Sequence, residues 1–179
     1  METNFRGTTI CAVKKDGKIA VAGDGQVTFQ NSIVFKNNGR KVKRIYNNSV
    51  VVGFAGSVAD AFSLCERFEN QLNKYSGNLL RSAVALAQTW REDKAMRQLE
   101  ALMIVADKST ILMIDGTGNV IEPQDGICAI GSGGNYALAA AKALLQNTND
   151  EAKDIAYKAV KIASEICIFT NDNIIVEEV

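Results

Sequence analysis

Apolar and β-branched residues occur in short runs over the first third of the chain, and turn-forming residues separate these runs. Residues 8–15 and 18–23 flank Asp16-Gly17, a dipeptide that is typical of two-residue hairpin loops. Residues 41–46 and 49–54 form a second pair of such runs around a short polar loop. The pattern therefore predicts two β-hairpins.

The first hairpin also predicts its own register. A two-residue loop pairs Lys15 with Lys18, and counting outward pairs Thr9 with Asp24. The hairpin thus carries Asp24 to the end of the strand that holds Thr8. In an ideal register Asp24 points to the same face as Thr9, so its carboxylate approaches the backbone end of Thr8 more readily than the Thr8 hydroxyl.

Apolar residues recur every three to four positions in four later segments, which is the spacing of amphipathic helices. Ser57 with Asp60 resembles a capping box that opens the first of these helices. Its predicted inner face consists of Val58, Ala61, Phe62, Cys65, Phe68 and Leu72. The second helix is expected at about residues 79–96, with Leu80, Val84, Ala87 and Trp90 facing inward. Two further helices are expected at about residues 136–146 and 150–169.

The remaining apolar runs predict strands at residues 101–106, 110–115 and 127–130 and near 173–177, whereas residues 27–35 fit a strand or a loop. The resulting order is strands, two helices, strands, two helices and a final strand. A regular alternation of strand and helix would indicate a parallel sheet. This grouping instead favours an α+β fold of two antiparallel sheets, each covered by a pair of helices.

Composition narrows the class of protein. With 179 residues, 47% of them hydrophobic, the chain fits one globular domain without a linker. Lysine plus arginine and aspartate plus glutamate both total 20, so no net charge attracts nucleic acid or an anionic membrane. The N-terminus resembles no signal peptide and no apolar stretch is long enough to span a bilayer, so we expect a cytoplasmic protein. The four cysteines contain no CxxC pair, which favours buried reduced thiols over a zinc site or disulfides.

The absence of histidine excludes several kinds of active site. The chain has 0 histidines, so a Ser-His-Asp triad, a Cys-His dyad and the usual histidine-ligated zinc sites are impossible. A covalent hydrolase without histidine can activate a hydroxyl with a lysine of lowered pKa or with the free α-amine of an N-terminal Ser or Thr. The candidate chemistry is thereby restricted to Ser, Thr and Lys.

Two glycine-rich turns connect a predicted strand to a predicted helix. The segment 131–134 (Gly-Ser-Gly-Gly) could suggest a phosphate-binding loop, but no GxxxxGK[ST] motif is present and Tyr136 stands where a dinucleotide fingerprint needs a small residue. The alternative is that its glycines let the backbone approach a site closely, with the Ser132 hydroxyl facing that site. The segment 53–57 is either a simple helix cap or a turn in which the Gly53 amide stabilises an oxyanion.

Residues 40–44 (Arg-Lys-Val-Lys-Arg) form a basic cluster, and its default interpretation is a solvated strand face. No interleaved aromatic pattern accompanies it, so RNA binding is not indicated. In a strand, Lys41 and Lys43 point away from the face of Arg40 and Arg44. One lysine can therefore face a site, where it would lower the pKa of a neighbouring hydroxyl nucleophile.

Several segments, in this order, resemble the HslV (ClpQ) family of bacterial proteasome-like peptidases from Thr8 essentially to Val179. The matching segments are Thr8-Thr-Ile, Gly23-Asp-Gly-Gln26, Arg40-Lys-Val42, Gly53-Phe-Ala-Gly56, Ala59-Asp-Ala-Phe62, Gly131-Ser-Gly-Gly134, Ile166-Cys and Thr170-Asn171. The resemblance implies an N-terminal-nucleophile hydrolase, a threonine endopeptidase with a four-layer αββα sandwich of two antiparallel sheets.

The resemblance also assigns roles to residues. Thr8 aligns with the catalytic threonine, whose freed amine takes the proton of the attacking hydroxyl. Lys41 aligns with the lysine that lowers the pKa of the nucleophile, and Asp24 with the acid that orients this lysine. Gly53 aligns with the oxyanion-hole amide, and Ser132 with the serine that supports the threonine amine.

The same resemblance implies a cofactor and partners. A monovalent cation, Na⁺ in our expectation, would be bound by backbone carbonyls around Ser164, Cys167 and Thr170. The family forms two stacked hexameric rings, a dodecamer, and works on protein substrates with a hexameric AAA+ unfoldase, HslU. That partner would use the ATP, which agrees with the absence of a nucleotide-binding motif here.

Residues 1–7 (Met-Glu-Thr-Asn-Phe-Arg-Gly) precede the aligned threonine, whereas many members of the family lose only the initiator methionine. We expect these residues to be a propeptide or N-terminal extension and residues 8–179 to be the peptidase domain. Gly7 is small enough to permit autolytic cleavage as in proteasome β subunits. The alternative is a non-catalytic ring subunit of the same fold that its extension keeps unprocessed.

Overall fold

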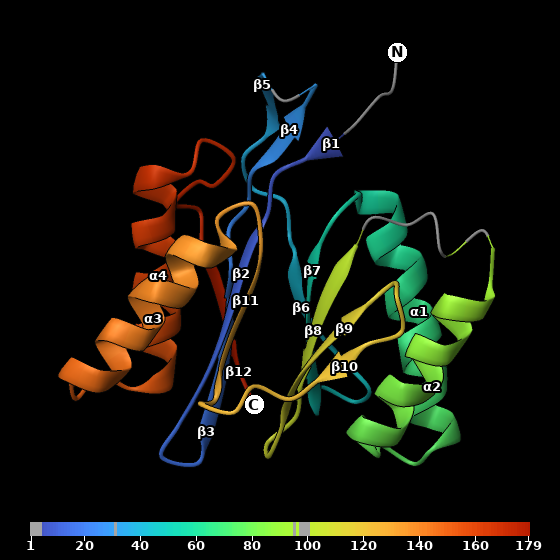
Figure 1. The fold of residues 1–179 in the computed structure, drawn as a ribbon. Coiled ribbons are helices and arrows are strands. Elements are labelled where there is room, and N and C mark those ends of the chain that lie inside the picture. Colours follow the sequence, from blue (N-terminus) through green and yellow to red (C-terminus); the bar gives the residue numbers. More distant parts are fainter. Residues whose placement is uncertain (1–4, 31, 95, 97–100) are drawn as a thin grey trace.

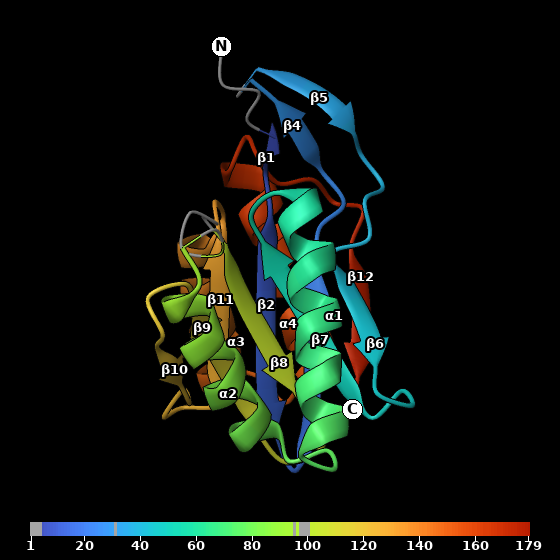
Figure 2. The ribbon, with the colours of Figure 1, turned by 90° about the vertical axis from the view of Figure 1, so that its right-hand side faces the viewer.

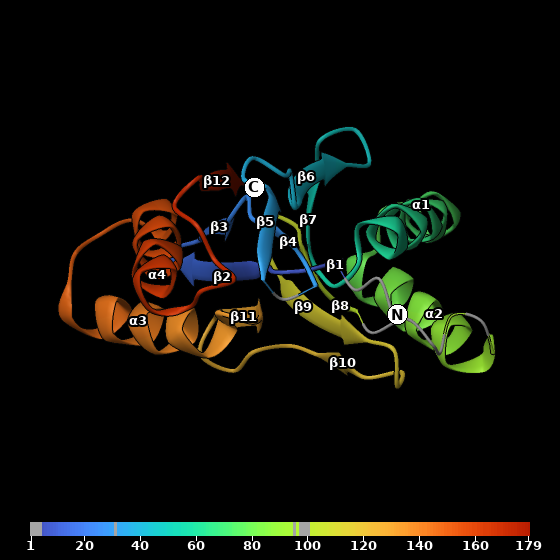
Figure 3. The ribbon, with the colours of Figure 1, turned by 90° about the horizontal axis from the view of Figure 1, so that it is seen from above.

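The computed structural model describes residues 5–30, 32–94, 96 and 101–179. Two antiparallel sheets lie face to face, and a pair of helices covers the outer face of each (Figures 1 and 3). The predicted α+β sandwich of four layers is therefore confirmed. A small third sheet, which contains the first described strand, lies at one end of the molecule (Figures 1 and 2).

The first sheet holds four strands in the order β11-β2-β3-β12, and we call it the four-stranded sheet. Its strands are β2 (Thr9–Lys15), β3 (Lys18–Gly23), β11 (Ile127–Gly131) and β12 (Ile175–Glu178). Lys15 pairs with Lys18 across the β2–β3 loop, as the Asp16-Gly17 dipeptide predicted. Asp16 and Gly17 have φ values of 50° and 76°, the left-handed conformations that a type I′ turn requires.

The second sheet, which we call the five-stranded sheet, has the order β10-β9-β8-β7-β6. Its strands are β6 (Val42–Ile45), β7 (Val50–Ala55), β8 (Leu102–Ala106), β9 (Ile111–Asp115) and β10 (Val120–Ile121). The small sheet has the order β1-β4-β5 and consists of β1 (Phe5–Arg6), β4 (Val27–Phe29) and β5 (Ile33–Lys36). The segment that fitted a strand or a loop thus forms a separate hairpin, to which β1 adds a third strand.

The helices are α1 (Val58–Lys74), α2 (Leu79–Glu92), α3 (Gly134–Asn147) and α4 (Ala152–Ile166). The Ser57 hydroxyl accepts a hydrogen bond from the Asp60 amide at 3.2 Å, so the predicted cap of α1 is present. No helix among the described residues is both long enough and apolar enough to cross a membrane.

Three apolar layers hold the elements together. Alternate residues of the first hairpin pack into two of these layers. Ile10 and Val21 face the five-stranded sheet, whereas Cys11 and Ala22 face α3 and α4. The third layer lies between the five-stranded sheet and helices α1 and α2. Both strands of the hairpin are thereby buried on two faces, which fixes the position of the Thr8 end.

The predicted inner face of the second helix was partly wrong. Leu80 and Val84 are exposed, whereas Leu79 and Ala83 are buried. The helix begins after Asn78, whose side chain accepts from the amide of residue 81, and this start places positions 79 and 83 over the sheet. A change of one position rotates a side chain by about 100° around the helix, so neighbouring apolar residues cannot share one face.

Two other helix predictions need correction. Helix α2 ends at Glu92 with Asp93 as its C-cap, before the expected residue 96. Phe62 was expected in the core, but 66% of it is exposed, because it lies near the start of α1, where the helix borders a cleft. The side chain of Val58, also expected in the core, lies outside the described residues.

Candidate active site at Thr8

Thr8 lies directly before β2, between the two large sheets. Only 4% of the residue is exposed, and its carbonyl accepts a hydrogen bond of 2.8 Å from the Ser132 amide. Gly131, with φ of +93°, passes so close that a Cβ atom there would lie 2.0 Å from the Thr8 carbonyl oxygen. The glycine turn at 131–134 therefore serves close backbone approach, as the second of its two interpretations predicted.

Asp24 follows β3 and is completely buried. Its Oδ1 accepts from the Thr9 amide at 2.7 Å and from Lys41 Nζ at 2.9 Å. Its Oδ2 accepts from the amides of Gln26 at 2.9 Å and Asn171 at 3.3 Å. The hairpin register predicted this approach to the backbone beside Thr8, and four donors stabilise the ionised carboxylate.

Lys41 reaches the same place from the residue before β6. Its Nζ donates to Asp24 and, at 2.6 Å, to the carbonyl oxygen of Gly7. Only 10% of its side chain is exposed. Burial lowers the pKa of the Lys41 ammonium below its ordinary value, and the neighbouring Asp24 carboxylate opposes part of that effect.

The Gly7 carbonyl receives a second donor. The Thr8 hydroxyl, Oγ1, donates to the Gly7 oxygen at 2.5 Å, and Gly7 has φ of +118°, a conformation that favours glycine. The peptide group that joins Gly7 to Thr8 is thus held between a hydroxyl and an ammonium group. This arrangement can polarise the carbonyl toward attack.

A cleft of about 320 Å³ opens beside this peptide group. Its lining includes Thr8, Lys41, Lys43, Gly56 and Phe62. Strands β4 to β7 and the start of α1 supply part of the lining, and the segments between these elements and before β2 supply the rest. The cleft is large enough for one or two side chains of an extended peptide.

The two glycines of the 53–57 turn differ in position. Gly53 pairs with Val42 on β6 and Ile104 on β8, and a Cβ atom there would lie 2.6 Å from Ile10. It is therefore in the interior of the sheet and does not line the cleft. Gly56 is exposed, lines the cleft and has φ of +143°.

Uncharged groups complete the other side of Thr8. The Thr9 hydroxyl accepts from the Gly133 amide at 3.0 Å and lies 2.7 Å from the Thr170 hydroxyl. Both threonines are buried. Ser132 contributes its amide to the Thr8 carbonyl, whereas its residue as a whole is exposed. These contacts fix the backbone on both sides of Thr8.

The proposed cation ligands lie at the end of α4. Cys167 is the C-cap, and its carbonyl accepts from the Thr170 amide at 3.0 Å. The last turn of α4 carries no basic residue, and its carbonyl oxygens have a partial negative charge. The Ser164 hydroxyl donates to the Lys161 carbonyl at 2.6 Å. Among the described residues, no group of three or more Cys, Asp or Glu side chains could hold a metal ion.

The structure gives roles at the site to three residues to which the sequence analysis assigned none. The Thr9 hydroxyl accepts from the Gly133 amide, and the Asn171 amide donates to the Asp24 carboxylate. Gly56 lines the cleft. Asn171 also accepts from the Gly25 amide and donates to the Asn37 carbonyl. Thr9 gave a usable signal, because in the predicted register it shares a face with Asp24. Asn171 lies in a segment that resembles the family, but no local pattern could pair it with Asp24, which is 147 positions away.

Comparisons with known proteins show the family to which the chain is similar. The proteasome subunit family model matches residues 4–179. An ATP-dependent protease subunit HslV from Staphylococcus carnosus is 58% identical over 178 residues, which cover 99% of each chain. A protein of the same name from Enterococcus faecalis is 60% identical over 181 aligned positions, with 99% of each chain covered. The crystal structure of HslV from Trypanosoma brucei superposes with a TM-score of 0.91 at 48% identity, covering 95% of this chain and 98% of that one.

Proposed function

The chain belongs to the proteasome subunit family, in its HslV branch, and we propose that it is a threonine-type endopeptidase, the proteolytic subunit of an ATP-dependent protease. The observation that carries the mechanism is the Gly7 carbonyl, which accepts hydrogen bonds from both the Thr8 hydroxyl and Lys41. This geometry supports two successive uses of Thr8. The first removes residues 1–7, and the second cleaves substrates.

In the first use, Thr8 Oγ1 attacks the carbonyl carbon of Gly7. The negative charge that develops on the carbonyl oxygen is stabilised by the ammonium of Lys41, 2.6 Å away. The bond between the Gly7 carbon and the Thr8 nitrogen then breaks, and this nitrogen takes the proton that the hydroxyl lost. Water hydrolyses the resulting ester, which releases residues 1–7 and leaves Thr8 with a free α-amine.

In the second use, the free α-amine replaces the missing histidine as general base. It accepts the hydroxyl proton of Thr8, directly or through water, while Oγ1 attacks the carbonyl of the substrate. Lys41 favours ionisation of the hydroxyl because its positive charge is close and poorly solvated, and Asp24 holds it there. The amine then protonates the leaving group, and water releases the second product.

An amide donor must meet the substrate oxyanion. The resemblance assigned this role to Gly53. However, Gly53 lies in β7 between β6 and β8, where backbone amides donate hydrogen bonds to the neighbouring strands. Gly56 lies on the cleft side of the same turn, which makes its amide the better-placed donor. The resemblance assigns Ser132 to support the α-amine of processed Thr8, and the Ser132 amide, which donates to the Thr8 carbonyl at 2.8 Å, keeps the two residues adjacent.

The family suggests both a protein partner and a bound cation for this chain. The relatives' names describe ATP-dependent proteases, so an HslU-type ATPase hexamer would unfold protein substrates for a dodecamer of this chain. A monovalent cation such as Na⁺ would be held by carbonyl oxygens of Ser164, Cys167 and Thr170 and would fix the loop that contacts Thr9 and Asp24. Replacing Na⁺ by choline should lower the thermal midpoint of unfolding, and an unchanged midpoint would argue against this site.

Thr8→Ala tests the nucleophile in both uses. We expect the variant to fold, to keep residues 1–7 and to lose peptide hydrolysis by more than about a thousandfold, because no other hydroxyl is held at this position. Intact mass spectrometry and a fluorogenic peptide assay measure the two effects. Thr8→Ser, which keeps a hydroxyl, should be processed and active. Residual hydrolysis in Thr8→Ala would place the nucleophile elsewhere.

One observation favours the alternative, an unprocessed and non-catalytic ring subunit. Strand β1, which directly precedes Gly7, pairs with β4 through Phe5–Phe29 and Arg6–Thr28. If the wild-type protein keeps its Met1 mass in an assembled complex and hydrolyses no peptide, the alternative is correct. If it keeps that mass and is nevertheless active, the free-amine mechanism is wrong.

A further inference from the structure

Asp24 and Lys41 both lie on segments without regular secondary structure. Asp24 follows the end of β3 at Gly23, and Lys41 ends the irregular segment 37–41, which joins β5 to β6. The Lys41 carbonyl accepts from the Phe54 amide at 3.2 Å, which ties its backbone to β7. Outside a strand ladder, individual contacts must hold the chain in place. The meeting of the two side chains therefore depends on what holds these two segments together.

Removal of residues 1–7 changes the contacts of the Lys41 ammonium. Before cleavage, its Nζ donates to the Gly7 carbonyl at 2.6 Å and to Asp24 Oδ1 at 2.9 Å. Cleavage releases the Gly7 carbonyl, and of these two partners only Asp24 stays. In the processed enzyme, the position of the ammonium therefore depends more strongly on the position of the Asp24 carboxylate.

The segments that carry Asp24 and Lys41 touch at Gly25. The Gly39 amide donates to the Gly25 carbonyl at 2.8 Å. A Cβ atom at Gly25 would lie 2.6 Å from the Asn37 carbonyl oxygen, so there is no room for a side chain between the segments. Their separation is thus set at the residue directly after the carboxylate.

The side-chain amide of Asn171 bridges the same two segments. Its Oδ1 accepts from the Gly25 amide at 3.0 Å, and its Nδ2 donates to the Asn37 carbonyl at 2.7 Å. These partners fix the orientation of the amide, because a backbone N–H can only donate and a carbonyl can only accept. The backbone amide of Asn171 also donates to Asp24 Oδ2 at 3.3 Å. One residue thus contacts the carboxylate, the backbone after it and the segment that leads to Lys41.

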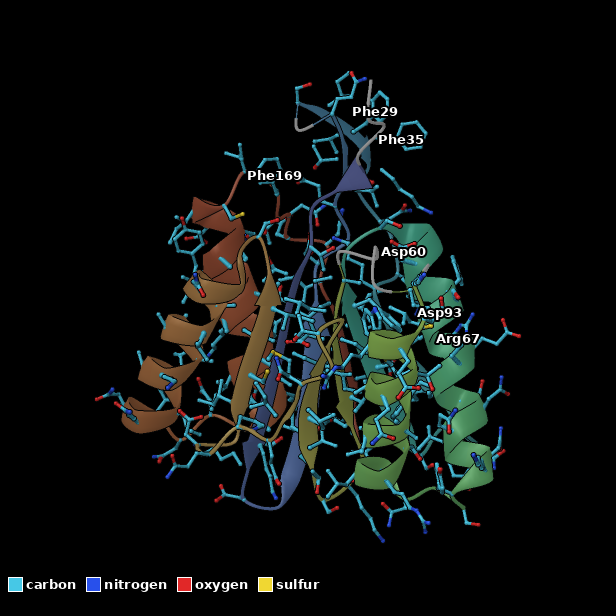
Figure 4. The ribbon with its side chains drawn as sticks, turned by 45° about the vertical axis from the view of Figure 1, so that its right-hand side comes forward. Phe29, Phe35, Asp60, Arg67, Asp93 and Phe169 are labelled. Carbon is cyan, nitrogen blue, oxygen red and sulfur yellow. The ribbon has the colours of Figure 1, made fainter. Side chains whose placement is uncertain are left out.

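Asn171 belongs to the loop after α4, which extends toward the end of the molecule that holds the small sheet (Figure 4). Asn173 of the same loop donates its backbone amide to Asn171 Oδ1 at 3.2 Å and its Nδ2 to the Asn37 carbonyl at 2.8 Å. Asn173 is exposed, whereas Asn171 is half-buried. Because Asn173 shares the Asn37 contact, it offers a matched control for Asn171.

We propose that Asn171 is a positioning residue that keeps the carboxylate of Asp24 bonded to the ammonium of Lys41 in the processed enzyme. The inference rests on the proposed peptidase function of Thr8. Without the bridge, the two segments are free to separate, and the ammonium then lies farther from the hydroxyl whose ionisation it favours. Before cleavage, the Gly7 carbonyl also holds the ammonium, so the bridge matters less for self-processing than for hydrolysis of substrates.

Asn171→Ala removes the bridge and keeps the backbone contact to Asp24. In the processed, assembled protease we expect kcat for a fluorogenic peptide to fall by about tenfold, the effect of one or two lost hydrogen bonds. KM should change by less than about twofold, since Asn171 is not among the residues that line the cleft. Removal of residues 1–7, measured by intact mass, should slow by less than about threefold. An unchanged kcat, or equal slowing of the two steps, would overturn the inference.

The pH profile gives a second readout. In the proposed mechanism the protonated form of Lys41 is the active one, so hydrolysis decreases at alkaline pH as the ammonium loses its proton. Burial lowers the pKa of Lys41, and the Asp24 carboxylate raises it. Loosening the pair in Asn171→Ala should therefore move the alkaline limb of kcat to lower pH. A loss of activity with an unshifted limb would indicate a structural role and overturn the inference.

The other charges around the pair are the same in every variant. The charged side chains on β5, β6, α1 and the loop after α4, with the segments that adjoin them, are Lys36, Arg40, Lys43, Asp60, Glu66 and Asp172. Arg40 and Asp172 already form ion pairs, with Glu177 and Lys161. A shift of the limb between wild type and Asn171→Ala therefore reports on the Asp24–Lys41 pair.

Two substitutions test which contact matters. Asn171→Asp keeps the acceptor for the Gly25 amide but cannot donate to Asn37, so it should lose most of the same activity. Its added carboxylate would raise the pKa of Lys41, so a loss at neutral pH would not come from a missing positive charge. Asn173→Ala leaves the bridge intact and should change kcat by less than about twofold. Wild-type kcat in Asn171→Asp would show that the bridge to Asn37 is not needed.

A third substitution controls for general loss of stability. Asn78→Ala removes the N-cap of α2, and the turn between α1 and α2 lies at the end of the molecule away from the small sheet (Figure 2). We expect a lower thermal midpoint of unfolding and a kcat within about twofold of the wild type. If Asn78→Ala and Asn171→Ala lower kcat alike, the effect is one of stability and the positioning role is wrong.

The last comparisons separate this inference from neighbouring proposals. Asn171 adjoins Thr170, a proposed cation ligand, so each assay is repeated at a higher NaCl concentration. Recovery of kcat in Asn171→Ala by NaCl would assign the effect to the cation and overturn the inference. Wild-type kcat and pH profile in this variant would remove the role of Asn171 and leave the peptidase intact. Failure of the wild-type protein to hydrolyse any peptide would reject both.

Discussion

Thr8 is held between two sets of groups that differ in kind. On one side, which we call the neutral side, are the backbone of Gly131 to Gly133 and the hydroxyls of Thr9 and Thr170. On the other, the charged side, are Lys41 and Asp24. The neutral side makes short, uncharged contacts that fix position, whereas the charged side can stabilise a developing negative charge. Separate parts of the fold thus position Thr8 and activate it.

This separation predicts different consequences of substitution on the two sides. Changes on the charged side should affect rates most strongly, because they remove a charge from a poorly solvated site. Changes on the neutral side should affect the free energy of unfolding more than the chemistry. The following three substitutions test this division, in order of decreasing effect.

Lys41→Met removes the cation from the charged side. We expect removal of residues 1–7 and peptide hydrolysis to slow by about a thousandfold, since charge stabilisation at the attacked carbonyl is lost. The buried Asp24 carboxylate also loses its partner, so the free energy of unfolding should fall by about 3 kcal/mol. Time-resolved intact mass and denaturant unfolding measure the two effects. Lys41→Arg keeps the positive charge, so it should restore the free energy of unfolding more fully than the rate of peptide hydrolysis. Equal recovery of both quantities would contradict the proposed separation of the charged and neutral sides.

Gly131→Ala disturbs the neutral side by steric conflict. A Cβ atom would lie 2.0 Å from the Thr8 carbonyl oxygen, and the residue has φ of +93°. We expect a loss of more than about 3 kcal/mol in the free energy of unfolding, because the backbone beside Thr8 must move. Gly17→Ala is a matched control: its φ is +76°, but a Cβ atom there meets nothing within 4 Å, so only about 1 kcal/mol should be lost. Similar losses in the two variants would show that steric approach at Thr8 is unimportant.

Thr9→Val removes one hydroxyl from the neutral side with little change in shape. The Gly133 amide and the Thr170 hydroxyl lose their partner, which should cost about 1–2 kcal/mol. Peptide hydrolysis should decrease by less than about tenfold, with the pH profile of the wild type, because Thr9 carries no charge. Thr170→Val and the double variant complete a cycle in which the two losses should not add. A shifted pH profile in Thr9→Val would assign this hydroxyl to the chemistry.

Much of the fold could be predicted because local signals agreed with the tertiary arrangement. Asp16-Gly17 specified both the turn and the register that carries Asp24 to Thr8. The order of strands and helices specified the layers. The inner face of α2 was predicted less well, since its sequence contains adjacent apolar residues, and only the start after Asn78 decides which of them are buried. The small sheet could not be predicted from periodicity, because β5 is exposed throughout and its apolar residues lack an alternating polar face.

The candidate site was predicted unevenly, for a physical reason. Thr8, Asp24 and Lys41 are close because two hairpins end at the same place, and hairpin registers can be counted in the sequence. Asn171 and Thr170 reach the site from the loop after α4, which also carries Phe169 toward the end of the molecule that holds Phe29 and Phe35 (Figure 4). The position of such a loop depends on how α4 packs on the four-stranded sheet. No local pattern encodes that packing.

The pairing of β1 with β4 has a consequence for the order of events at this site. While residues 1–7 remain attached, Phe5 and Arg6 occupy the edge of β4 beside the cleft. Their release would expose the edge of β4 with which β1 pairs, and an exposed edge is a template for another extended chain. Cleavage after Gly7 would then have two effects. It would create the free α-amine of Thr8, and it would expose the edge of β4, along which an extended substrate can bind.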